Sequence, residues 1–162
     1  MSLSAVYCSR SRSSKTYAEM FAKIMKCNCV SITGPVPDGD IVFFGWISGG
    51  GKLNGYDQLN HGNLLAVCAV GLNYPSEDII HSIEHKNNIT VPVYYCMGCI
   101  DRSCLKPSEK FLLSVICLFT HFKCKGQQGD VLRDVIKHGG TFVSEDQLYP
   151  LIEYCTAVKK RS

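Results

Sequence analysis

The fold is decided by residues 3–25, which read LSAVYCSRSRSSKTYAEMFAKIM. The segment opens with a short apolar run at residues 3–8 that changes abruptly to a polar loop, as is typical of a buried parallel strand. Four apolar side chains then follow at the i, i+3, i+4, i+7 spacing of one helix face, namely Ala18, Phe21, Ala22 and Met25. Ser13 or Ser14 is expected to be the N-cap of this helix. Residues 3–25 therefore predict a strand, a loop and a helix, in that order.

The same alternation continues along the chain. Short apolar runs predict four more strands, at residues 29–32, 40–45, 64–70 and 90–96. The helix before the last strand has three isoleucines on its expected inner face, Ile79, Ile80 and Ile83. Later helices are expected at 111–119, 131–138 and 145–158. This order predicts an α/β fold with a parallel sheet, in which the loops after the strands share one edge, where ligands of open α/β sheets bind.

Composition narrows the classes of protein to consider. A chain of 162 residues suits a single domain, 1–162, and its 46% apolar and 19% charged residues are typical of globular proteins. We expect a cytoplasmic protein, because no apolar run reaches the roughly 18 residues of a membrane span and no secretory signal is evident. The ten cysteines are then expected as free thiols. The net charge of +3 comes with no basic stripe interleaved with aromatics, which argues against a nucleic-acid partner.

The loop after the first strand is the first candidate site. It consists of Ser9, Arg10, Ser11, Arg12, Ser13 and Ser14. Backbone N–H groups at the start of a helix favour an anion, and the four hydroxyls add donors for phosphate oxygens. The alternative is a polar turn whose serines only cap the helix. The residues alone leave both open.

Residues 7–19, YCSRSRSSKTYAE, resemble the phosphate-loop signature of flavodoxins, Ser/Thr-x-Thr-Gly-Asn-Thr. Ser9, Ser11 and Ser14 stand at its hydroxyl positions and Ser13 at its asparagine position. The resemblance continues, in order, through 40–46 (DIVFFGW), 49–52 (GGGK), 66–71 (AVCAVG), Tyr74-Pro75 and 95–98 (YCMG). It implies a three-layer flavodoxin-like α/β/α sandwich with strand order 2-1-3-4-5 and one non-covalently bound FMN.

Two features depart from that family. Arg10 and Arg12 stand where flavodoxins commonly carry glycine or small residues, so they either add charge to the phosphate or crowd the site. Flavodoxins are also commonly acidic, whereas this chain is mildly basic. We therefore expect its redox partner protein or small acceptor to be acidic or carboxylate-bearing.

The second candidate loop follows the third strand and would lie along the flavin ring. Its residues are Trp46, Ile47, Ser48, Gly49, Gly50 and Gly51. Trp46, the only tryptophan, offers an aromatic face for stacking. The resemblance implies that a peptide among the glycines turns its carbonyl toward flavin N5. The alternatives are an ordinary core or rim aromatic and a plain loop.

The third candidate loop follows the fifth strand. By resemblance, backbone N–H groups of Met97, Gly98, Cys99 and Ile100 meet the carbonyls of the flavin pyrimidine. The spacing Cys96-x-x-Cys99-x4-Cys104 also allows a zinc or iron–sulfur site, although no fourth ligand is evident, or a redox-active Cys96–Cys99 pair. The five histidines are scattered, so no catalytic residue and no metal ligand are predicted.

The sequence therefore favours an FMN-binding electron-transfer protein that passes electrons to a partner reductase or a small acceptor. A second hypothesis is a flavodoxin-type reductase that acts on a bound quinone or tetrapyrrole. A third is a flavodoxin fold that has lost FMN and serves as an interaction module, which the two arginines keep open.

Overall fold

The structure, a computed structural model, describes residues 2–48, 50–59, 63–100, 107, 134–135 and 137–161. The chain divides into two units, one formed by Met1–Gly98 with Val143–Ser162 and the other by Cys99–Phe142. The expected single domain, 1–162, stays a prediction.

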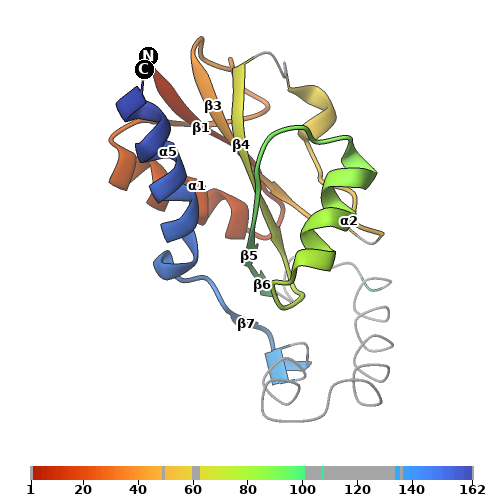
Figure 1. Ribbon diagram of the computed structural model, residues 1–162. Coiled ribbons are helices and arrows are strands. Elements are labelled where there is room, and N and C mark those ends of the chain that lie inside the picture. Colours follow the sequence, from red (N-terminus) through yellow and green to blue (C-terminus); the bar gives the residue numbers. More distant parts are fainter. Residues whose placement is uncertain are drawn as a thin grey trace. The chain divides into compact units, whose positions relative to one another are not determined.

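A five-stranded parallel sheet forms the centre of the first unit (Figure 1). Its strands are β1 (Leu3–Cys8), β2 (Asn28–Ser31), β3 (Asp40–Trp46), β4 (Leu64–Gly71) and β5 (Val93–Met97). They lie in the order β2-β1-β3-β4-β5, and every neighbouring pair is parallel. The predicted fold class and strand order are confirmed. The order reverses at β1, so the carboxyl ends of β1 and β3 flank the switch point at which such sheets bind ligands.

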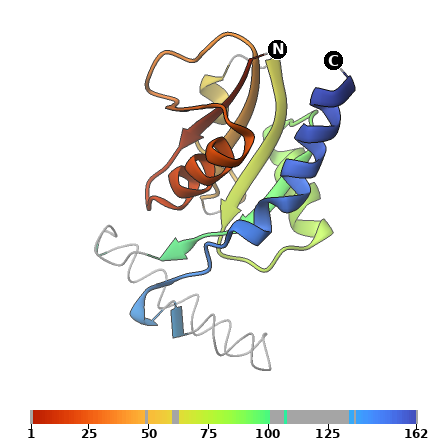
Figure 2. The same cartoon turned by 90° about the vertical axis from the view of Figure 1, so that its left-hand side faces the viewer.

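Helices cover both faces of this sheet. α1 (Ser13–Met25) and α5 (Tyr149–Arg161) lie on one face, and α2 (Glu77–Asn87) lies on the other (Figures 1 and 2). Two short 3-10 helices, η1 (Tyr56–Gln58) and η4 (Glu145–Leu148), complete the unit. The helix expected at 145–158 is thus present as η4 followed by α5. The result is the three-layer α/β/α sandwich.

Neighbouring residues of β3 show how the sheet is held from both sides. Side chains alternate between the faces of a strand. Phe44 packs on Phe21 of α1 with ring centroids 5.4 Å apart, and Phe43 packs on Tyr56 of η1 at 6.3 Å. Burying each such side chain contributes about 1.5–3 kcal/mol. The two layers fix the sheet, and with it the edge from which the candidate loops emerge.

The expected inner face of α2 and the later helices are confirmed only in part. Of the three isoleucines expected on the inner face of α2, Ile83 is buried, whereas Ile79 and Ile80 are half-buried. In the second unit, β6 (Cys99–Ile100) pairs antiparallel with β7 (Gly140–Thr141). The helix expected at 111–119 lies outside the described residues. Of the helix expected at 131–138, residues 134–135 and 137–138 are described, and they are helical.

Candidate functional site

The loop between β1 and α1 differs from the expected capping pattern. Arg12, and neither Ser13 nor Ser14, is the N-cap of α1, and both serines are the first residues of the helix itself. Arg12 has φ 68° and ψ −22°, a left-handed backbone, and no side chain caps the helix. The predicted serine cap is therefore wrong, because the chain turns into the helix one residue earlier. The alternative in which these serines serve only as caps falls with it.

The start of α1 is electrostatically suited to an anion. The N-terminus of a helix carries a partial positive charge from N–H groups that have no partner within the helix. No acidic residue lies in the first turn of α1 to offset that charge. Two arginines, Arg10 and Arg12, stand in the preceding loop and add to it. The local field therefore attracts negative charge.

Two buried hydroxyls of this loop lack a hydrogen-bond partner among the described residues. They are Oγ of Ser9, directly after β1, and Oγ of Ser14, whose residue is 1% exposed. A buried polar group without a partner costs about 1–3 kcal/mol. A third such hydroxyl, on Ser4, lies within β1 and away from the loop. The loop therefore holds two buried hydroxyls that have no hydrogen-bond partner among the described residues.

Trp46 links the first loop to the second. The guanidinium carbon of Arg10 lies 5.7 Å from the centroid of the Trp46 ring, within range of a cation–π contact. The carbonyl of Trp46 accepts two bonds from Asn54, one from its backbone N–H at 3.0 Å and one from Nδ2 at 3.1 Å. Burial raises the pKa of the Cys8 thiol, and a hydrogen bond with the Trp46 side chain partly offsets this. Trp46 is thus half-buried and fixed in place.

The glycine-rich segment is a hairpin tied to α2. Ile47 and Leu53 form an antiparallel bridge, and Gly50 and Gly51 adopt the positive φ values of 84° and 88° that the turn requires. Two helix residues hold the tip of this hairpin. Nζ of Lys86 donates to the Gly50 carbonyl at 2.6 Å, and Nδ2 of Asn87 donates to the Gly51 carbonyl at 3.0 Å.

This attachment bears on the expected flavin contact. The carbonyls of Gly50 and Gly51 already have partners in α2, and the Ser48 carbonyl accepts the Gly51 N–H at 3.1 Å. Gly49 lies outside the described residues. A glycine carbonyl that turns toward a flavin therefore stays a prediction, and for Gly50 or Gly51 it requires a bond to α2 to break. Sequence reasoning did not identify Lys86 or Asn87 as residues of this site.

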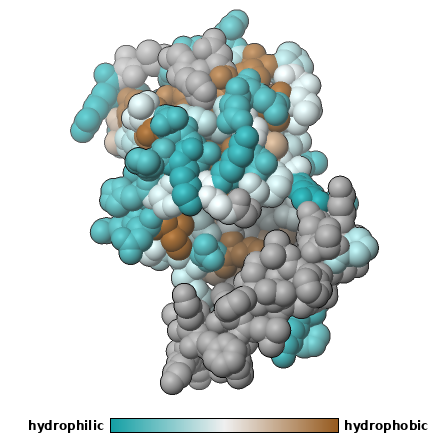
Figure 3. All heavy atoms as spheres, turned by 90° about the vertical axis from the view of Figure 1, so that its right-hand side faces the viewer, coloured by the Kyte–Doolittle hydropathy of each residue, from teal (hydrophilic) through white to brown (hydrophobic). Residues whose placement is uncertain are grey.

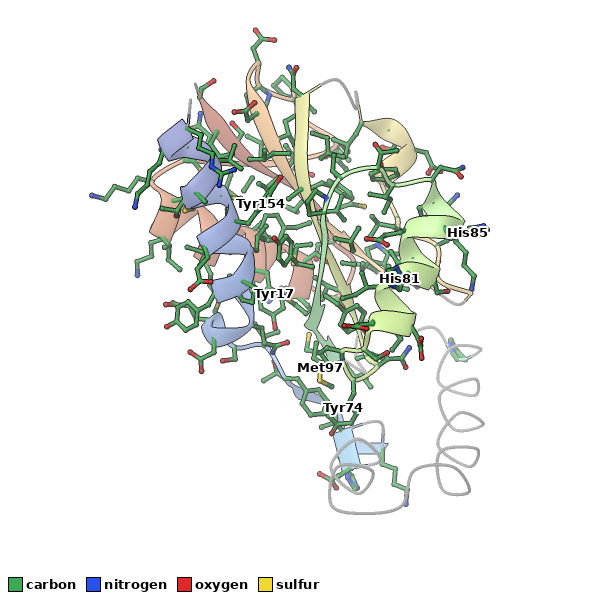
Figure 4. All side chains as sticks on the ribbon, in the orientation of Figure 1. Tyr17, Tyr74, His81, His85, Met97 and Tyr154 are labelled. Atoms are coloured by element: carbon green, nitrogen blue, oxygen red, sulfur yellow. The ribbon has the colours of Figure 1, made fainter. Side chains whose placement is uncertain are left out.

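Backbone groups of the third loop already form hydrogen bonds within the chain. The Met97 N–H donates to Oε1 of Gln147 at 2.6 Å, and the Gly98 N–H donates to the Gly71 carbonyl at 2.7 Å. The Tyr17 hydroxyl donates to the Met97 carbonyl at 2.7 Å, and both residues are labelled in Figure 4. In this arrangement neither N–H is available to a flavin carbonyl. Cys99 and Ile100 belong to the second unit, where they pair with β7.

The first and third loops nevertheless meet. A Cβ placed on Gly98 would lie 3.1 Å from Oγ of Ser13 and 3.0 Å from Val70. A side chain at position 98 would press against the first turn of α1. Of the predicted site residues, the structure thus brings together those of the first loop with Trp46 and with Gly98.

Of the three cysteines in the metal-site and redox-pair alternatives, Cys96 and Cys99 lie among the described residues. Cys96 is fully buried, and its Sγ lies 3.5 Å from Sγ of Cys68. The pKa of Cys68 is raised well above its usual value, first by the hydrogen bond with Cys96 and then by burial. Cysteines buried in apolar surroundings are inert. Cys104 lies outside the described residues, and within the described ranges no three His, Cys, Asp or Glu side chains are grouped to hold a metal.

The outer face of α2 carries exposed polar groups. His81 and His85 project from it, and Nδ1 of His81 lies 3.1 Å from Oε2 of Glu84 (Figure 4). Seen from the side on which α2 lies in Figure 1, hydrophilic side chains cover most of the coloured surface and apolar ones are scattered (Figure 3). Over the part of the chain that the structure describes, no helix is both long and apolar enough to span a membrane.

No family model matches the chain, and no curated protein matches its sequence. The strand order of the sheet is that of a flavodoxin-like α/β fold. A fold does not by itself imply a function. The function must be inferred from the loops at the carboxyl edge of the sheet.

Proposed function

We propose that this chain binds FMN non-covalently and acts as a cytoplasmic electron-transfer protein. One observation carries the proposal, which is the pair of buried, unpartnered hydroxyls of Ser9 and Ser14 beside an uncapped helix N-terminus. This donor set fits a phosphate, and it lies in the loop at the switch point of the sheet. The sequence resemblance then selects FMN among phosphate compounds.

Different residues would contact the phosphate and the ring of FMN. Ser9 and Ser14 would donate to phosphate oxygens, and Trp46 would offer its ring to the isoalloxazine. Bound FMN would supply the redox chemistry, which belongs to the cofactor. The role of this chain is to bind the phosphate, orient the ring and limit its access to water. The redox partner protein or small acceptor is proposed to be acidic or carboxylate-bearing, in line with the net charge of +3.

One observation favours a second candidate function, a cofactor-free interaction module. The N–H groups of Met97 and Gly98 and the carbonyls of Gly50 and Gly51 already have partners within the chain. A ring bound there would have to replace these bonds. The module hypothesis predicts that neither a flavin nor phosphate binds.

Binding of FMN and riboflavin to the purified protein separates the two candidates. Riboflavin lacks only the phosphate, so the proposal predicts FMN binding at least about tenfold tighter, because a charge-assisted hydrogen bond contributes on the order of 1.5–3 kcal/mol. Quenching of flavin fluorescence measures both constants. Equal affinities would remove the phosphate from the proposal, and no binding of either flavin would leave the interaction module.

A further inference from the structure

Arg12 combines an unfavourable backbone with an exposed side chain. Its φ of 68° lies in the left-handed region, which L-residues other than glycine rarely adopt. Its carbonyl is turned into the helix, where it accepts the N–H of Thr16 at 2.8 Å and the Thr16 hydroxyl at 3.1 Å. Glycine would take this conformation without cost. Arginine at this position therefore adds a charged side chain at a steric cost to the backbone.

The two arginines of the loop differ in what their guanidinium groups contact. Arg10 lies over the Trp46 ring. Arg12 is exposed and forms no ion pair in the described part of the chain. A left-handed residue followed by a helical one also turns successive N–H groups toward one point, which makes an anion-binding concavity. The residue at this turn also carries a full positive charge on an exposed side chain.

The Ser14 hydroxyl is a buried donor without a partner at the start of α1. Ser14 is 1% exposed, lies in the first turn of α1, and its Oγ has no partner among the described residues. A single hydroxyl and the helix N-terminus recognise an anion of any charge. An arginine fork adds selectivity for a phosphate group, because it offers parallel N–H donors to two oxygens.

We propose that Arg12 is the specificity-determining residue of this loop and makes it selective for phosphomonoester dianions over singly charged anions. The inference deepens the proposed FMN function and rests on it for the ligand, but it concerns the phosphate alone. Arg10, whose guanidinium lies over Trp46 in the ligand-free protein, is given no part in this selectivity.

The test replaces Arg12 by glycine and compares it with a matched change at the other end of the same helix. Lys26, the C-cap of α1, is also left-handed, with φ 53°. Arg12→Gly and Lys26→Gly both relieve a left-handed L-residue and both remove one positive charge, so neither should lower the melting temperature. Only Arg12→Gly should weaken binding of inorganic phosphate and of FMN, by about tenfold.

Two further ligands, nitrate and riboflavin, are compared with phosphate and FMN. Nitrate at matched ionic strength probes a singly charged anion, and the preference for phosphate over nitrate should disappear in Arg12→Gly. Riboflavin affinity should be the same in all variants, because it has no phosphate. Binding is followed through flavin fluorescence and through the emission of Trp46, the only tryptophan in the chain.

The outcomes distinguish this inference from the proposed function. Phosphate binding that depends on Arg12, without any FMN binding, would support the inference and refute the FMN function. FMN binding that is equal in the wild type, Arg12→Gly and Lys26→Gly would overturn the inference and leave the FMN function standing. Absence of phosphate binding in the wild type would also overturn the inference.

Discussion

Replacing Ser14 by alanine is expected to stabilise the ligand-free protein and weaken FMN binding at once. The Ser14 hydroxyl is buried without a partner, and such a group costs about 1–3 kcal/mol. Alanine also has the higher helix propensity, by up to about 0.7 kcal/mol. We therefore expect the free energy of unfolding to rise by about 1 kcal/mol in the absence of FMN, because loss of the oxygen leaves a small void that offsets part of the gain.

The same substitution should cost stability when FMN is present. Loss of one donor to the phosphate is expected to weaken binding about tenfold. At a saturating FMN concentration, a tenfold weaker affinity removes about 1.4 kcal/mol of ligand stabilisation. The advantage of Ser14→Ala without ligand should therefore vanish or reverse with ligand. Urea unfolding followed by circular dichroism, with and without FMN, measures both differences.

Ser4→Ala provides the control. Ser4 also has a buried, unpartnered hydroxyl, but it lies in β1 and away from the loop. Its removal should stabilise the protein equally with and without FMN. The reasoning is refuted if Ser14→Ala destabilises the ligand-free protein, since the hydroxyl would then have a structural partner. It also fails if Ser14→Ala and Ser4→Ala respond to FMN alike.

Two further predictions concern other parts of the molecule. Asn87→Ala should lower the free energy of unfolding by about 2–4 kcal/mol in urea, because the side chain makes three hydrogen bonds at 2.8–3.0 Å, whereas Lys86→Ala, at an exposed residue, should cost less than about 1 kcal/mol. Cys29 and Cys155 should not affect the pH dependence of stability below about pH 9 and should lower stability between about pH 9 and 12, because burial raises the pKa of Cys29 to about 11 and of Cys155 to about 12, so the unfolded chain loses these protons first. Unfolding in reductant across that range, with Cys155→Ala giving a shallower fall, checks the second prediction.

Local sequence pattern predicted most of the fold because buried parallel strands are marked by short apolar runs. The runs at 3–8, 40–45 and 64–70 needed no information from elsewhere in the chain, and each became a strand of the sheet. The start of α1 was missed for a local reason. A serine is the usual N-cap, and nothing in the sequence marks Arg12 as left-handed.

The partners of the candidate site were missed for a different reason. Asn87 meets the glycine hairpin from 36 positions away at Gly51, and Gln147 meets Met97 from 50 positions away. Neither contact belongs to a periodic pattern, so only the tertiary structure brings the groups together. The loops were identified because each follows a strand, but the state of their donors and acceptors was not accessible to sequence reasoning.

The hydrogen-bonding state of these donors and acceptors determines what each part of the proposed site contributes to binding. At the proposed phosphate end, the Ser9 and Ser14 hydroxyls have no partner among the described residues, so a bound phosphate would gain hydrogen bonds without breaking any. At the ring end, the Met97 and Gly98 N–H groups have partners, and exchanging one hydrogen bond for another gains little free energy. The phosphate should therefore set the strength of binding. Trp46 would then select among phosphate compounds. Its ring can stack on a planar ligand only when Arg10 moves off it.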